Sequence, residues 1–173
     1  MTNAVIIRDF SSDDDVATLT QLLNEAYQPL AQAGLRFFAS YQNQQQTEER
    51  LAAGQALVAE IDGQLVGTIT ITGPDPTSPC LYYRRDGVFC LGQFAVGSAW
   101  QGRGIGRALL KAAQARAKKL GAREVALSTA ESAAKLIAWY KRSGFLPVEF
   151  VAWSTTNYRS VILAKPLTKQ TEK

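Results

Sequence analysis

Hydrophobic and polar positions alternate along the chain with two different periods, and each period predicts a different kind of element. Short apolar stretches rich in valine and isoleucine predict strands, whereas apolar residues that recur every three or four positions predict helices. In the first half this pattern predicts, in order, a strand at 4–10, a helix that follows the polar stretch 11–15 and runs to about Ala31, a shorter helix at about 47–53, and strands at 55–61 and 64–72. Asp62-Gly63, between the last two segments, is a strong signal for a hairpin turn.

The second half of the chain predicts two helices and four strands around a run of glycines. The prolines of GPDPTSP (73–79) end the hairpin and begin an irregular loop that reaches about Asp86. The elements expected after it are a continuous apolar strand at 87–96, a helix at about 104–120, a strand at 123–129, a helix that ends at Gly144, and strands at about 148–154 and 157–164. Ser128 and Glu131 form an S-x-x-E pattern, which predicts a capping box at the start of the second helix.

This order of elements predicts an α/β fold with a mixed sheet. The strand at 87–96, the helix at 104–120 and the strand at 123–129 form a β-α-β unit, so the two strands should be parallel with a right-handed crossover. The apolar stripe expected to cover the sheet from this helix consists of Ile105, Leu109, Ala113, Ala117 and Leu120. We expect a single domain over residues 1–168 and a frayed tail at 169–173, because no internal repeat or domain boundary is visible.

Composition removes several kinds of chemistry. The chain has 173 residues and a net charge of +4, and it contains no histidine, which excludes a Ser-His-Asp triad. Its two cysteines, Cys80 and Cys90, have no metal-ligand spacing, so we expect no metal site. We interpret the basic run Tyr82–Arg85 as a solvated loop and expect no nucleic-acid partner. Because no apolar stretch reaches the length of a membrane span and no secretory signal is visible, we expect a cytoplasmic protein that does not bind membranes.

The segment WQGRGIGR (100–107) places three glycines at a strand-to-helix junction. Bare backbone at such a junction permits the close approach of a ligand, often a phosphate held by the first amides of the helix, although a tight turn alone needs glycines as well. A Walker loop is excluded because no Gly-Lys pair occurs in it. A dinucleotide-binding fingerprint fails because Arg107 stands at its third glycine position and Glu124 begins the following strand instead of ending it.

A second motif decides between these interpretations. Residues Gln101–Gly106 (QGRGIG) resemble the [QR]-x-x-G-x-[GA] motif of the GCN5-related N-acetyltransferases (GNAT), and Tyr140–Phe145 (YKRSGF) resembles the Y-x-x-x-G-F motif that follows it in that family. The clearest similarity covers residues 87–146, and the hairpin before it is also similar to the family pattern. The resemblance implies the GNAT-type fold, a mixed, mostly antiparallel sheet of about seven strands with flanking helices and a central parallel β-α-β unit.

The resemblance also implies acetyl-CoA as the co-substrate and a set of site residues. Tyr140 matches the tyrosine that protonates the departing thiolate; its alternative is a core aromatic. The family pattern assigns cofactor binding to Phe94, Ala95, Val96, Gln101, Gly102, Arg103, Gly104, Ile105, Gly106 and Arg107, with the glycine-rich amides at the pyrophosphate and the strand backbone along the pantetheine arm. In this family the two parallel strands separate near the thioester, and a strand amide at Val96 or its neighbour stabilises the oxyanion.

Two positions depart from the family pattern. The family's pantetheine-binding asparagine is replaced by Ala133, for which Ser132 or the backbone of 132–135 is a candidate substitute. The glutamate base of the histone-acetylating members is replaced by Cys90. The general base therefore stays open between Glu131, Tyr83, Asp86, Glu25, a chain of waters, and an amine that arrives already neutral.

We therefore expect an N-acetyltransferase that transfers the acetyl group of acetyl-CoA to a primary amine of a small molecule or peptide by direct attack. Transfer of another acyl group and a non-catalytic CoA-binding sensor are the alternatives. The segments expected around the acceptor are rich in aromatic residues and poor in acids, which favours an aromatic or uncharged-backbone amine over a polyamine: Tyr27, Phe37, Phe38, Tyr41, Tyr82 and Tyr83. Either a monomer or a homodimer is compatible with this sequence.

Overall fold

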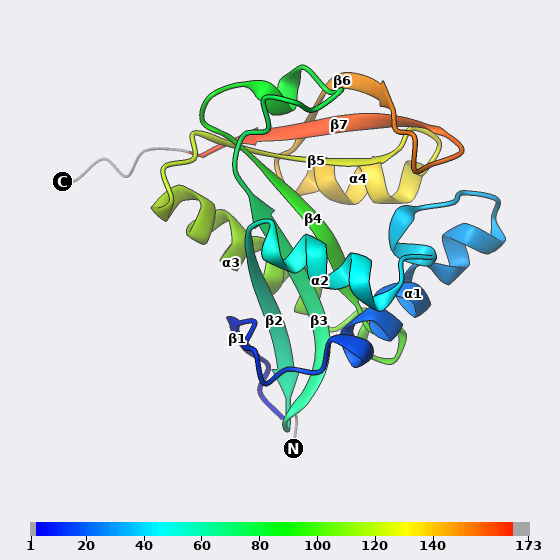
Figure 1. The fold of residues 1–173 in the computed structure, drawn as a ribbon, viewed down its shortest axis with the longest axis vertical. Coiled ribbons are helices and arrows are strands. Elements are labelled where there is room, and N and C mark those ends of the chain that lie inside the picture. Colours follow the sequence, from blue (N-terminus) through cyan, green and yellow to red (C-terminus); the bar gives the residue numbers. More distant parts are fainter. Residues whose placement is uncertain (1–2, 168–173) are drawn as a thin grey trace.

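The sheet runs through the centre of a computed structural model that describes residues 3–167. Within that range seven strands pair in the order β1-β2-β3-β4-β5-β7-β6, as Figure 1 shows. The strands are β1 (Ile6–Asp9), β2 (Gln55–Ile61), β3 (Gln64–Thr72), β4 (Val88–Val96), β5 (Glu124–Ala130), β6 (Leu146–Ala152) and β7 (Arg159–Pro166). The expected mixed sheet is confirmed: β4 and β5 are parallel, and the other neighbours are antiparallel.

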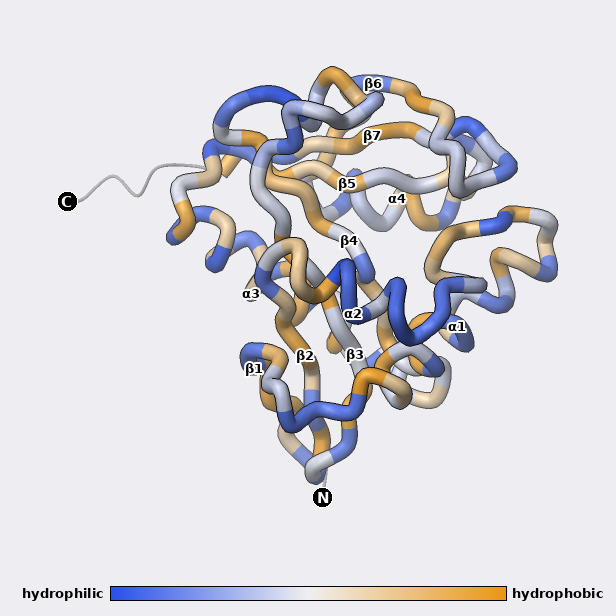
Figure 2. The backbone as a smooth tube through the Cα atoms, viewed as in Figure 1, coloured by the Kyte–Doolittle hydropathy of each residue, from blue (hydrophilic) through white to orange (hydrophobic). Residues whose placement is uncertain are grey.

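Four helices cover the two faces of this sheet: α1 (Val16–Gln32), α2 (Gln44–Ala52), α3 (Ile105–Lys119) and α4 (Ala134–Arg142). In Figure 1, α2 passes in front of β2 and β3, whereas α3 lies behind them. Leu19 and Leu23 of α1 pack with Ala95 of β4 on the first face, and Leu109 and Ala113 of α3 join the main core on the other. Figure 2 shows the same division as orange strands inside and a largely blue α2 outside.

The helix boundaries follow local capping chemistry. Asp15 caps α1 by accepting a hydrogen bond from the Ala17 amide, as the polar stretch before it predicts. Helix α2 begins three residues earlier than expected because Asn43 and Gln46 form a complete capping box in front of it. None of the helices in residues 3–167 is both long and apolar enough to cross a membrane.

Two expectations about the second half are wrong. Ser128 and Glu131 do not form a capping box: β5 continues to Ala130 because it pairs with β7 throughout, and the Glu131 amide donates to the Arg159 carbonyl. Helix α4 starts only at Ala134 and has no side-chain cap. Leu120 does not complete the apolar stripe of α3, since it lies beyond the helix end and is 41% exposed.

The end of the chain is described up to Leu167, where the Leu167 amide donates to the Arg123 carbonyl. The expected tail at 169–173 lies outside the described residues, and the boundary at 168 stays a prediction. Gly144, the expected end of the second helix, follows α4 with φ +95°, a conformation that favours glycine.

Candidate active site

The two parallel strands separate after their first residues. β4 and β5 pair only where Val88, Phe89 and Cys90 face Glu124, Val125 and Ala126. Beyond that point β5 keeps β7 as its partner on one side and has no strand on the other, so Ser128 is exposed in the middle of the sheet. On β4, Gln93 has φ +43° at a shift in the register with β3. The structure therefore contains the opening that the family resemblance implies.

Two clefts meet at this opening. We call the larger one, about 630 Å³, the helix-side cleft because the N-terminus of α3 lines it. We call the other, about 390 Å³, the loop-side cleft because it leads out between α2 and the loop after β6. Five residues line both clefts: Tyr27, Phe37, Phe94, Ser128 and Tyr140. Tyr140 therefore lies where the two clefts meet.

The N-terminus of α3 presents free backbone donors to the helix-side cleft. Gly104 precedes the helix in the left-handed conformation with φ +82°, and no side chain caps it. Nothing lies within 4 Å of where a Cβ would stand on Gly102 or Gly104, so the space in front of the first amides is open. No acidic residue occurs in the first turn. Free amides at the positive end of a helix are a favourable site for an anion such as a phosphate.

The open edge of β4 is the second feature of the helix-side cleft. Tyr27 donates a hydrogen bond to the Phe94 carbonyl at 2.7 Å, and the Gln101 amide nitrogen donates to the Val96 carbonyl at 3.0 Å. These two carbonyls point away from β3, because Gly97 is the residue that donates to Val66 of β3. The amides of Phe94 and Val96 lie on the same edge, where β5 has left the sheet. They are available to a ligand that runs along the strand.

Most of the predicted cofactor residues line the helix-side cleft: Phe94, Ala95, Val96, Gln101, Gly102, Gly104, Ile105, Gly106 and Arg107. Arg103 does not; its guanidinium lies 5.0 Å over the Trp100 ring. Ser132 is exposed in the turn before α4 and is also absent from the lining. Ala133 is buried with Phe37 and Ala130 in a small apolar cluster. The roles assigned to Arg103 and Ser132 stay predictions.

Tyr140 lies on the buried face of α4 and reaches the junction of the clefts. Its ring packs against Trp139, Phe145 and Phe94, with centroids 5.2, 5.9 and 6.5 Å away. Burial, with a smaller contribution from Tyr27, raises the pKa of its hydroxyl far above the usual value for a phenol. The hydroxyl stays protonated at neutral pH. The same burial that weakens it as an acid also disfavours a thiolate beside it, so the phenol is positioned to give a proton to a sulfur at the junction.

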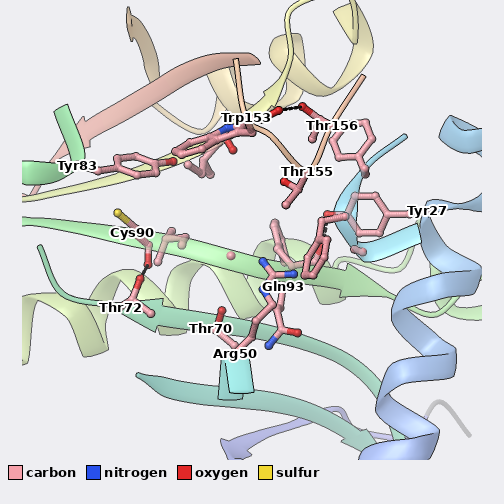
Figure 3. A pocket seen from close by; sticks show the side chains of 18 of the residues that line it. Tyr27, Arg50, Thr70, Thr72, Tyr83, Cys90, Gln93, Trp153, Thr155 and Thr156 are labelled. Carbon is pink, nitrogen blue, oxygen red and sulfur yellow. Dashed lines mark hydrogen bonds between the residues drawn. The ribbon is translucent and has the colours of Figure 1, made fainter. Parts of the chain in front are cut away.

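The loop-side cleft is aromatic and polar, and within the described chain no carboxylate lines it. Figure 3 shows Tyr83, Trp153, Thr155 and Thr156 along one side and Arg50 rising from α2 on the other. Of the aromatic residues expected around the acceptor, Tyr27, Phe37, Phe38 and Tyr83 line the cleft. Tyr41 and Tyr82 do not: Tyr41 donates to the Thr155 carbonyl, and Tyr82 hydrogen-bonds to Glu124.

Comparison with known proteins shows which family the chain belongs to. The acetyltransferase (GNAT) family model matches residues 16–145. The chain belongs to the GNAT acetyltransferase family. It is 30% identical over 134 residues to the S-(2-succino)cysteine N-acetyltransferase of Bacillus subtilis (strain 168), covering 76% of this chain and 79% of the relative. It is 29% identical over 137 residues to the S-alkylcysteine N-acetyltransferase of the same organism, covering 76% and 74%.

The fold is also that of solved GNAT structures. A GNAT family acetyltransferase from Elizabethkingia anophelis, solved with acetyl-CoA bound, superimposes with a TM-score of 0.68 at 16% identity, covering 96% of this chain and all of the other. The mixed seven-stranded sheet is thus that of the GNAT fold. Acetyl-CoA is the acetyl donor of this family.

In this GNAT enzyme only one of the side-chain candidates for a general base, Tyr83, lines the loop-side cleft among the described residues. Glu131 is paired with Arg159 at 2.7 Å, Asp86 is exposed beside Arg123, and Glu25 accepts a hydrogen bond from Gln21 on the surface. Tyr83 lines the loop-side cleft, but burial raises the pKa of its hydroxyl well above the usual value, so the hydroxyl stays protonated at neutral pH and cannot accept a proton. Within residues 3–167 no group of three or more cysteines and carboxylates is arranged to hold a metal ion.

Sequence reasoning missed Arg50 and the role of Ser128. Arg50 lies on a largely polar helix, and nothing in that pattern distinguishes it from a solvated arginine. Burial against β4, which lowers the pKa of its guanidinium, depends on how α2 sits over the sheet. Ser128 was expected at a helix cap, but it faces both clefts from β5.

Proposed function

We propose that this protein is an N-acetyltransferase that transfers the acetyl group of acetyl-CoA to the primary amine of a small molecule or peptide. The observation that carries the proposal is the meeting of two clefts at Tyr140. One cleft ends at free amides of a helix N-terminus, and the other opens to the surface past aromatic side chains. This arrangement suits a reaction between a large phosphorylated donor and a small acceptor that enter from different sides.

In this proposal the amides at the start of α3 hold the pyrophosphate of acetyl-CoA, and the open edge of β4 pairs with the pantetheine arm. Arg107 lines this cleft and adds positive charge. The amide of Val96 or of Phe94 stabilises the oxyanion that forms when the amine attacks the thioester carbonyl. The carbonyls of those residues are held by Gln101 and Tyr27, which fixes the edge before the cofactor arrives.

The chemical step forms a carbon–nitrogen bond and breaks the carbon–sulfur bond of the thioester. Tyr140 gives its proton to the departing sulfur, and the proton lost by the nitrogen returns through water to the phenolate. The products are the N-acetylated amine and CoA with a free thiol. Because no carboxylate among the described residues lines the loop-side cleft, the amine enters in its neutral form.

The two curated relatives support a small acceptor. Their names specify S-(2-succino)cysteine and S-alkylcysteine as the substrates of those enzymes. An S-substituted cysteine is therefore the first class of acceptor to test for this chain. A cytoplasmic location, the absence of membrane and nucleic-acid partners, and a monomeric or homodimeric state stay predictions.

The test is release of free CoA thiol from acetyl-CoA in the presence of purified protein and a panel of amines. The panel should contain S-substituted cysteines, other amino acids, simple amines and short peptides, with mass spectrometry of each product. Acetylation of at least one amine supports the proposal. Calorimetric binding of acetyl-CoA without turnover of any amine would instead favour a CoA-binding sensor, and faster turnover of propionyl- or succinyl-CoA would change the acyl group.

A further inference from the structure

Arg50 is a charged side chain in the loop-side cleft with no acidic partner among the described residues. Its Nη1 donates to the side-chain oxygen of Gln42 at 2.7 Å, and its guanidinium lies 5.3 Å from the centre of the Phe38 ring. A guanidinium carries five N–H donors, and this contact uses one of them. Burial lowers the pKa of Arg50, and no carboxylate contributes to raising it. A half-buried cation without a counter-charge favours an anionic ligand.

The side-chain amides of Gln42 and Gln93 form a hydrogen-bonded chain behind Arg50. Because Arg50 must donate to the Gln42 oxygen, the Gln42 nitrogen faces the other way and donates to the Gln93 oxygen at 2.8 Å. The Gln93 nitrogen is thereby left without a hydrogen-bond partner among the described residues, although it is buried. The Thr47 hydroxyl accepts a second hydrogen bond from the Gln42 nitrogen at 2.7 Å, which fixes the orientation of that amide. This network holds the guanidinium in place, and the side-chain oxygens of Gln42 and Gln93 both accept hydrogen bonds within it.

The guanidinium lies on β4 close to the junction of the two clefts, which favours a short separation between its ligand group and the acceptor amine. A Cβ built on Gly92 would lie 3.4 Å from Arg50 Nη2 and 3.5 Å from the Thr70 hydroxyl, so the guanidinium rests on the strand at Gly92. Phe94, at the junction of the clefts, is two residues further on, and the bulge at Gln93 makes this step shorter than the roughly 6.6 Å of a regular strand. In an α-amino acid only one carbon separates the carboxyl carbon from the amine, and each of these bonds is about 1.5 Å long. Together with a charge-assisted hydrogen bond of about 2.8 Å to the guanidinium, this places the amine at a similar distance from Arg50.

We propose that Arg50 binds a free carboxylate on the carbon that also carries the acceptor amine. The acceptor is then a free α-amino acid rather than a peptide N-terminus, because a peptide bond converts that carboxylate into a neutral amide. The aromatic side of the cleft, where Tyr83 and Trp153 lie with ring centroids 5.8 Å apart, takes the apolar side chain of the amino acid. This inference rests on the proposed function and names the group by which the site selects its substrate.

The test uses three acceptors that differ at one group: S-benzyl-L-cysteine, its carboxamide, and 2-(benzylthio)ethylamine. In the wild-type protein, kcat/KM for the acid should exceed that for the carboxamide on the order of 10- to 100-fold, the usual range for a hydrogen bond to a charged group. Arg50→Gln should remove this preference by lowering kcat/KM for the acid alone. Arg50→Lys keeps the charge without the two-pronged geometry and should retain part of the preference.

Arg36→Gln is the matched control. Arg36 is an exposed arginine between α1 and α2, lies 4.0 Å from the Tyr41 ring centre, and does not line the cleft. Its loss should leave the acid-to-carboxamide ratio unchanged. Thermal unfolding of each variant shows whether it is folded. Equal kcat/KM for acid and carboxamide in the wild type, or a ratio that survives in Arg50→Gln, would overturn the inference and leave the proposed function intact.

A binding measurement separates this inference from the chemistry. N-acetyl-S-benzyl-L-cysteine and its carboxamide can be titrated calorimetrically into the protein saturated with CoA. The acid should bind on the order of 10- to 100-fold more tightly to the wild type, and with similar affinity to the carboxamide in Arg50→Gln. Equal affinity of the two compounds in the wild type overturns the carboxylate site. A preserved preference without turnover of any amine supports the carboxylate site and contradicts the proposed acetyl transfer.

Discussion

Tyr140→Phe removes one hydroxyl at the junction of the two clefts and preserves the ring that packs there. The ring contacts with Trp139, Phe145 and Phe94 do not involve the hydroxyl, and burial rather than a hydrogen bond is the main cause of its raised pKa. Loss of the hydroxyl should therefore change the free energy of unfolding by less than about 1 kcal/mol. The thermal midpoint is the measurement that checks this.

The same substitution should lower kcat on the order of 10²-fold, the lower range of general acid catalysis. That factor corresponds to about 2.7 kcal/mol of transition-state stabilisation. The affinity for acetyl-CoA should change little, because the hydroxyl acts on sulfur only as the carbon–sulfur bond breaks. An acyl donor whose thiol is more acidic leaves without help, so the variant should lose less activity with that donor.

Tyr82→Phe provides the matched control, because it deletes a phenolic hydroxyl that lies outside both clefts. Tyr82 hydrogen-bonds to Glu124, so this variant should lose stability while its kcat stays unchanged. The reasoning is refuted if Tyr140→Phe has the kcat of the wild type with both acyl donors while chemistry limits the rate. In that case Tyr140 is a core aromatic and the proton for sulfur comes from water.

Three further predictions follow from the same structure. Gly104→Val should abolish acetyl-CoA binding measured by calorimetry. The control Gly121→Val carries similar backbone strain, at φ +97° beyond the end of α3, and should retain binding. Equal affinities of the two variants for acetyl-CoA would show that Gly104 is not part of the cofactor site. The free energy of unfolding should stay level between pH 6 and 8, since the chain has no histidine. It should fall above about pH 9, because burial raises the pKa of Tyr27 and of Cys90 to about 12 and the unfolded chain therefore releases these protons at a lower pH than the folded protein does. A free energy of unfolding that stays level to pH 11 would contradict the burial of these two groups. With no carboxylate base, kcat/KM should rise about tenfold per pH unit until the amine of the acceptor is neutral, and a plateau well below the amine pKa would reveal a base.

Much of the fold is visible in the sequence because the signals are local. The hairpin around Asp62-Gly63 has the predicted bounds, and the buried stripe of α3 follows its helical period from Ile105 to Ala117. Boundaries failed where tertiary contacts outweighed a local motif. Ser128 and Glu131 have the right spacing for a capping box, but pairing with β7 keeps the backbone of β5 extended through Ala130.

The two clefts were predictable to different degrees. The helix-side cleft depends on a glycine motif and on the strand next to it, and both are continuous in sequence, so nine of the eleven predicted cofactor residues line it. The loop-side cleft is assembled from α2, β4, the loop at Tyr83 and the loop at Trp153, which are far apart in the chain. Burial of Arg50 is a property of that assembly, and no short pattern around residue 50 encodes it.

The lack of a carboxylate base and the charge of Arg50 are chemically consistent with each other. A carboxylate in the loop-side cleft would pair with Arg50, neutralise it and stabilise the protonated amine, which cannot attack a thioester. Arg50 is the charged group of the described lining, and an acceptor carboxylate would pair with it. The guanidinium then offsets the negative potential by which that carboxylate stabilises the neighbouring ammonium, so the pKa of the bound amine is lowered relative to the free amino acid. In this proposal one side chain both selects the substrate and promotes its reactive protonation state. The wild type should therefore acetylate the acid at a lower pH, relative to the amine pKa, than Arg50→Gln does, and coincident pH profiles of the two proteins would contradict this coupling.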